Sequence, residues 1–149
     1  WALCLSPLLL LLIPLLMRRK SFVATADFID AMIASDAVAE MRNRRYRWLV
    51  MREVYAAYAG RESGGVYFDD ILKASDYSRT DAEDLMEKTG IDLKTAGVLV
   101  LAERTGLLAT QDAELAEAAA ALGVTVVDRE IYLAEYAARG GGATAGRSS

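Results

Sequence analysis

The segment 96–128 constrains the fold of this chain more strongly than any other. It reads AGVLVLAERTGLLATQDAELAEAAAALGVTVVD, which is an apolar helical pattern, a glycine, a short strand, the turn Thr110-Gln111-Asp112, an alanine-rich helix, a second glycine and a second strand. This alternation predicts α/β architecture, with a small parallel sheet and helices on its faces. In such a sheet the turn after a strand lies at the carboxyl edge, where ligands bind. Asp112 is therefore the first side chain for which we expect a chemical role.

The composition excludes several kinds of functional site. At 149 residues we expect one domain with a substantial core. The formal net charge of −4 excludes a uniformly basic surface, although it leaves room for a local basic patch. The chain contains no histidine and a single cysteine, so His-based catalytic triads, His or Cys zinc sites and disulfide frameworks are excluded. A metal site must use oxygen ligands, which suits Mg²⁺ or Mn²⁺.

Three segments differ in composition. Residues 1–17 form a hydrophobic leader, of which 1–16 are uncharged, and a basic cluster follows it. Two interpretations stay open: a membrane anchor that holds the domain on the cytoplasmic side, or an upstream extension before a start at Met17. Residues 18–139 are expected to be the folded domain, and the Gly/Ser-rich residues 140–149 a flexible tail.

Periodicity and turn residues predict the remaining elements. In chain order we first expect a strand at 21–23 and a helix with the apolar set Phe28, Ile29, Met32 and Ile33. One or two helices over 37–59, a loop at 61–65 and a short helix at 67–74 follow. A capping box at Thr80 and Glu83 opens the next helix, which Gly90 ends, and Asp128 caps the last helix.

Three ordered motifs in residues 21–136 resemble the PIN domain family, which includes the toxin ribonucleases of toxin–antitoxin pairs. The first is FVATADFID at 22–30, which is similar to the opening strand and turn of the family. The second is WLVMREVY at 48–55, which is similar to the helix that contributes a glutamate. The third is the Thr-x-Asp turn at Thr110 and Asp112. The resemblance implies a three-layer α/β fold with a small, mostly parallel sheet flanked by helices.

The resemblance also implies a reaction and its residues. Members of the family cleave RNA with three or four carboxylates that hold one or two Mg²⁺ or Mn²⁺ ions. Glu53 and Asp112 keep the positions of catalytic acids, and with Asp92 they form the expected metal ligands. Thr25 and Thr110 keep positions that support those ligands.

Two acids of the family pattern are replaced in this chain. The aspartate at the end of the first strand falls on Ala24, and the aspartate at the start of the helix before the Thr-x-Asp turn falls on Thr95 or Gly97. We therefore expect a ribonuclease that is weakened or inactive. The alternative is a module without catalysis that binds RNA, an antitoxin-like protein or a second copy of itself. Asp112 as a simple helix N-cap and Glu53 as a surface residue are the structural alternatives to their roles as ligands.

A cluster of arginines, with Tyr46 and Trp48 among them, suggests contact with RNA phosphates and bases or with an anionic membrane surface. The competing interpretation is that these arginines pair with acids on a solvated face. The candidates for RNA binding are Arg44, Arg45, Arg47 and Arg52.

A second fold remains open for residues 68–108, whose short helices and tight turns suggest a winged-helix DNA-binding unit. Its recognition helix would be AGVLVLAER, which is too apolar to lie in a DNA groove.

Overall fold

The computed structural model describes residues 20–137. Within that range five strands form a sheet in the order β5-β2-β1-β6-β7, and each neighbouring pair is parallel. The strands are β1 (Lys20–Ala24), β2 (Tyr46–Val50), β5 (Leu72–Ala74), β6 (Leu107–Ala109) and β7 (Thr125–Val127). A short antiparallel hairpin joins β3 (Glu62–Ser63) to β4 (Val66–Tyr67). The predicted α/β class with a small, mostly parallel sheet is confirmed.

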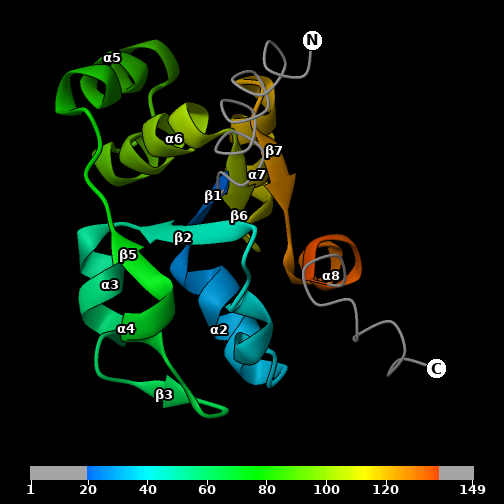
Figure 1. Ribbon diagram of the computed structural model, residues 1–149. Coiled ribbons are helices and arrows are strands. Elements are labelled where there is room, and N and C mark those ends of the chain that lie inside the picture. Colours follow the sequence, from blue (N-terminus) through cyan, green and yellow to red (C-terminus); the bar gives the residue numbers. More distant parts are fainter. Residues whose placement is uncertain (1–19, 138–149) are drawn as a thin grey trace, which may run out of the picture.

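Helices cover both faces of the sheet and complete a three-layer arrangement. Helices α5 and α6 lie on one side and α2 and α3 on the other (Figure 1), as right-handed crossovers require when the strand order reverses at β1. The helices are α2 (Ala26–Ala34), α3 (Arg52–Tyr58), α5 (Arg79–Thr89), α6 (Leu93–Thr105) and α7 (Ala113–Ala121), with shorter elements η1 (Val38–Met41), α4 (Phe68–Ile71), α8 (Arg129–Ile131) and the π-helical η2 (Tyr132–Ala137).

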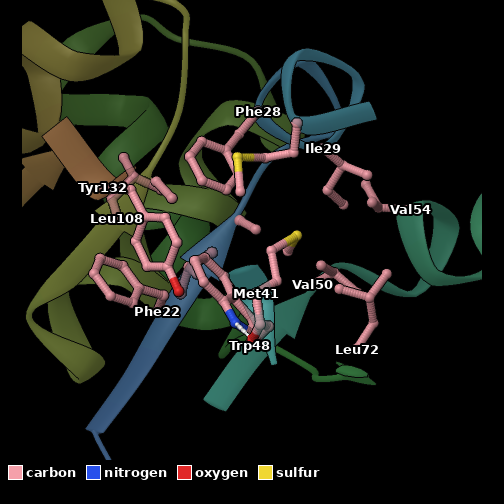
Figure 2. Close-up of a cluster of buried hydrophobic side chains, with 14 of the residues drawn as sticks. Phe22, Phe28, Ile29, Met41, Trp48, Val50, Val54, Leu72, Leu108 and Tyr132 are labelled. Atoms are coloured by element: carbon pink, nitrogen blue, oxygen red, sulfur yellow. Dashed lines mark hydrogen bonds between the residues drawn. The ribbon is translucent and has the colours of Figure 1, made fainter. Parts of the chain in front are cut away.

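Trp48 lies at the centre of the aromatic core between the sheet and α2. Its ring stacks on Phe22 and Phe28, with centroids 5.0 and 5.5 Å away. The ring of Tyr132 meets it edge-on at 5.0 Å. The indole Nε1–H donates to the carbonyl of Met41 at 2.7 Å, so the one polar atom of this buried ring is satisfied (Figure 2). This bond ties η1 to β2.

The prediction of helices throughout 37–59 is wrong, because that segment contains the second strand of the sheet. Tyr46, Trp48 and Val50 are buried, whereas Arg47 between them is exposed. This alternation is the period of a strand with one buried face. Tyr46 and Trp48 therefore belong to the core, and they cannot stack on RNA bases.

Two further predictions differ from the structure. The expected short helix at 67–74 contains only one helical turn, α4, before the chain enters the edge strand β5. The expected loop at 61–65 is the hairpin of β3 and β4, whose turn uses Gly64 and Gly65 at φ of 57° and 82°. Positive φ at both turn residues matches the twist of the hairpin and favours glycine.

The predicted helix ends are mostly confirmed. Helices α5 and α6 end at Gly90 and Gly106, which adopt the left-handed conformation. Asp128 caps α8 through the N–H of Ile131. The cap of α5 is Ser78, whose hydroxyl accepts from the N–H of Asp81, and not the predicted box at Thr80.

The winged-helix alternative is wrong, because the proposed recognition helix lies inside the protein. Helix α6 packs on the sheet and is buried over most of 96–102. The leader and the tail lie outside the described residues. Within 20–137, no helix is long and apolar enough to cross a membrane.

Replacing Trp48 by alanine should lower the free energy of unfolding by about 3–5 kcal/mol, because it removes the centre of the aromatic core. Replacing its exposed neighbour Arg47 by alanine should change stability by less than about 0.5 kcal/mol. Urea unfolding followed by circular dichroism measures both. Similar losses from the two variants would contradict the strand assignment.

Candidate functional site

The candidate site lies where the strand order of the sheet reverses. From β1 the chain continues into α2 on one face, and from β6 it continues into α7, which packs beside α6 on the other. The loops after these two strands therefore diverge and leave a crevice at the carboxyl edge of the sheet. A pocket of about 550 Å³ lies there.

We call this cavity the carboxyl-edge pocket. Its walls combine apolar side chains with acids at the rim, and α2, α3, α6 and α7 all contribute. The lining residues are Ala24, Thr25, Ala26, Asp27, Met51, Val54, Ile91, Asp92, Lys94, Thr95, Val98, Asp112, Glu114, Leu115 and Ala118.

Two threonines and one aspartate form a hydrogen-bonded group at the strand ends. The register of β1 and β6 pairs Ala24 with Ala109, so the next residues, Thr25 and Thr110, meet with hydroxyl oxygens 3.0 Å apart. Both hydroxyls donate to Oδ1 of Asp27, which lies in the first turn of α2. The distance from the Thr110 hydroxyl to this oxygen is 3.3 Å. The backbone N–H of Gln111 donates to the same oxygen at 3.4 Å. This group links the ends of the two central strands through side chains.

Asp112 lines the pocket and also caps α7. One of its oxygens, Oδ1, accepts from the N–H groups of Glu114 and Leu115, at 2.9 and 3.3 Å. The Asp112 N–H in turn donates to the hydroxyl of Thr110 at 3.2 Å. Asp112 is therefore the N-cap of α7, as the structural alternative for this residue expected. The second carboxylate oxygen of Asp112 accepts no hydrogen bond from the residues described.

The other predicted acids lie in different surroundings. Asp92, at the N-cap position of α6, lines the pocket, and the Thr95 hydroxyl lowers the pKa of its carboxyl. Glu53 is exposed in the first turn of α3 and is not one of the residues that line the pocket. The structure thus brings Asp92 and Asp112 to one cavity and leaves Glu53 outside its walls.

The structure also separates the two candidates for the replaced acid on α6. Thr95 lines the pocket. Gly97 faces Tyr77 instead, and a Cβ atom at Gly97 would come within 2.7 Å of the Tyr77 ring. Gly97 is thus a packing position, and Thr95 is the residue beside Ala24, Asp92 and Asp112.

The arrangement of acids is a poor match to a ready-made ion site. Ala24 offers no ligand atom, Thr95 offers a neutral hydroxyl, and Oδ1 of Asp27 is already occupied by its donors. Among residues 20–137 no three Asp, Glu, Cys or His side chains form a group that could hold a metal ion. The role of Glu53, Asp92 and Asp112 as metal ligands stays a prediction.

A tyrosine anchors α3 to α2 beside the pocket. The buried hydroxyl of Tyr58 donates to the carboxylate of Asp30 and reaches the Ala26 carbonyl at 3.3 Å. Burial, together with the carboxylate of Asp30, raises the pKa of Tyr58 to about 12. The hydroxyl therefore stays a proton donor at neutral pH, which fixes the helix that bears Glu53.

The predicted RNA-binding arginines do not form one cluster. Arg52 follows β2 and forms a two-bond ion pair with Asp76, at 2.5 and 2.9 Å, which lowers the pKa of that carboxyl. Arg44, Arg45 and Arg47 are exposed around the start of β2, at the opposite end of the strand. The interpretation that these arginines pair with acids holds for Arg52.

Asp27 lies three residues after Ala24 and could replace the lost acid only with a shifted turn, so it is not among the metal ligands expected from the sequence. It lies 83 positions before Thr110, so their contact depends on the pairing of β1 with β6. The signal in the sequence was its place two residues after Thr25, at the end of the first strand. Lys94 and Glu114 were also missed, and they are placed by the first turns of α6 and α7.

No protein-family model matches the chain. No curated protein matches it either. The structure is similar to the crystal structure of PAE2754 from Pyrobaculum aerophilum, with a TM-score of 0.57 and 18% sequence identity over 82% of this chain and 98% of that one. At this level of identity the similarity concerns the fold alone, and it supports the α/β arrangement described above.

The contact of Gly97 with Tyr77 can be tested by a double-mutant cycle. Gly97→Ala should destabilise the protein, because the cost of overpacking, about 1–3 kcal/mol, exceeds the gain of about 1 kcal/mol in helix propensity. In a Tyr77→Ala background the same change should be neutral or stabilising. Thermal unfolding of the four proteins gives the coupling. Additive effects would contradict the assignment of Gly97 as a packing position.

Proposed function

We propose that this protein is a PIN-like domain in which metal-dependent ribonuclease activity is weakened or lost, and that it works as a binding module. The observation that supports this most directly is the identity of two residues in the carboxyl-edge pocket. Ala24 and Thr95 line it at the positions where the resemblance expects aspartates. The partners we propose are RNA, an antitoxin-like protein or a second copy of the chain, and the proposed location is the cytoplasm.

The chemistry of phosphodiester hydrolysis explains why these two positions matter. A bound Mg²⁺ or Mn²⁺ supplies an activated water and stabilises charge on the phosphate, and several carboxylates must share such an ion. A methyl group at Ala24 and a neutral hydroxyl at Thr95 remove two negative charges from the shared set. Residual activity would depend on Asp92 and Asp112, with Glu53 from the neighbouring helix.

The bonds of the remaining acids also support loss of catalysis. Asp27 is held by the hydroxyls of Thr25 and Thr110 and by the N–H of Gln111. Oδ1 of Asp112 caps α7. Both carboxylates therefore stabilise the loops at the strand ends, and an ion would have to compete with these donors.

The first test is RNA cleavage by the purified full chain in Mn²⁺, compared with Asp112→Asn. We expect cleavage by the unaltered chain to lie at or close to the background rate of Asp112→Asn, because the chain lacks two of the acids that would share an ion. The double variant Ala24→Asp, Thr95→Asp restores both carboxylates, and it should bind Mn²⁺ at least about tenfold more tightly, since each added carboxylate is a hard oxygen ligand.

Calorimetry measures the Mn²⁺ affinities, and a melting curve of each variant shows that it is folded. The single variant Thr95→Asp is the matched control, because it adds one acid without burying a charge beside β1. RNA cleavage by the unaltered chain in Mn²⁺ that Asp112→Asn abolishes, and that restoring both acids in the double variant does not increase, would overturn the proposal. Equal Mn²⁺ affinity of the double variant and the unaltered chain would contradict the assignment of these two positions.

A further inference from the structure

A second cavity lies near the start of β2, away from the carboxyl-edge pocket. It has a volume of about 860 Å³, and the loop after η1, the first half of β2 and the edge strand β5 form its walls. Four exposed cations line it: Arg42, Arg44, Arg47 and Lys73. We call this cavity, with these four cations, the basic groove.

The cations of the basic groove are not neutralised by salt bridges within the part of the chain that the structure describes. Within residues 20–137 none of the four forms a salt bridge, whereas Arg52, Arg79 and Arg129 each do. Among the described residues that line the groove, Asp70 is the single carboxylate. Like charges gathered in a concave site repel one another, and an anion that enters relieves this repulsion.

The backbone segment between η1 and β2, which carries Arg42 and Arg44, is fixed to the core by hydrogen bonds. Trp48 fixes the end of η1 through the carbonyl of Met41, just before Arg42. The side chain of Asn43 accepts from the N–H of Arg45 at 2.8 Å and shapes the turn into β2. The groove is therefore formed by backbone that the folded core positions, and little ordering is needed when a ligand binds.

The register of the sheet directs two of the cations to the same face. Leu49 pairs with Lys73, and Arg47 lies two residues before Leu49 in the same strand. Side chains two residues apart share a face of a strand, so Arg47 and Lys73 point to one side of the sheet. Arg42 and Arg44 approach the groove from the loop at its end.

We propose that the basic groove binds the phosphate backbone of a single nucleic acid strand without reading its bases. Three of the four cations are arginines, whose planar guanidinium groups match phosphate oxygens. The aromatic rings nearest in sequence, Tyr46 and Trp48, are 7% and 2% exposed, so they offer no surface for base stacking. Binding is therefore electrostatic and independent of base sequence.

The concave shape of the groove favours a strand over a flat surface. The cations line a cavity at the edge of the sheet, and a flat lipid headgroup layer would not reach into it. The inference concerns a site separate from the carboxyl-edge pocket, and it does not depend on whether that pocket cleaves RNA.

The test is binding of fluorescein-labelled single-stranded RNA to the full chain, followed by anisotropy in EDTA over a range of salt concentrations. EDTA removes divalent metal, so cleavage does not interfere. Two oligonucleotides of equal length and unrelated sequence should bind equally. When the logarithm of the association constant is plotted against the logarithm of the salt concentration, the slope should become less negative by about 0.7 for each groove cation removed. Arg44→Gln with Arg47→Gln should weaken binding about tenfold at low salt.

Two further variants make the result decisive. Arg79→Gln removes the same charge from α5, outside the groove, and it should leave binding unchanged. Asp70→Asn removes the carboxylate of the groove, and it should tighten binding. Loss of the fold would disrupt a groove that the folded core positions, so a gain of affinity in a variant whose melting curve is unchanged tests the site even where a charge deletion harms the fold.

Three outcomes would overturn the inference. The first is that Arg79→Gln weakens RNA binding as much as the groove variants do. The second is that Asp70→Asn has no effect on RNA binding. The third is that the chain binds poly-glutamate or anionic phosphatidylserine vesicles, and that the groove variants abolish this binding while RNA binding persists. Mn²⁺-dependent cleavage that Asp112→Asn abolishes, and that the double variant Ala24→Asp, Thr95→Asp does not increase, would contradict the proposed function and would leave the groove inference intact.

Discussion

The parallel pairing of β1 with β6 is the constraint on which the site depends. It aligns Val23 with Leu108 and Ala24 with Ala109, so the first residues beyond both strands, Thr25 and Thr110, come together. On its other side β1 pairs with β2, which brings Trp48 beside Phe22. One buried strand thus joins the aromatic core to the carboxyl-edge pocket, and the reversal of strand order at β1 opens the crevice that this pocket occupies.

The net charge of −4 conceals a separation of charge between two parts of the molecule. Acids border the carboxyl-edge pocket, whereas four exposed cations line the basic groove near the start of β2. The chain direction of a parallel sheet produces this separation, because all the strands end at one edge and begin at the other. An acidic protein can therefore present a local surface for a polyanion, which the average composition does not reveal.

The sequence predicted the fold class and the segment 96–128, because local periodicity and glycine positions determine those elements. The prediction of a helix at β2 is wrong, because a five-residue strand within an arginine-rich stretch gives a weak period-two signal. At the site, Thr25, Thr110, Asp92 and Asp112 reach the predicted edge. The contact of Asp27 with Thr110 and that of Gly97 with Tyr77 depend on tertiary packing, so no local pattern could reveal them.

The proposed function requires that the carboxyl-edge pocket hold its acids in structural hydrogen bonds and bind no divalent ion tightly. Paramagnetic broadening of backbone amide signals by Mn²⁺, in a nitrogen-15 correlation spectrum of the full chain, measures this directly. We expect the amides of Thr25, Asp27, Thr110 and Asp112 to lose intensity no faster than those of exposed acids elsewhere, such as Glu87. Selective loss of those four signals at Mn²⁺ concentrations that leave Glu87 unaffected would contradict it.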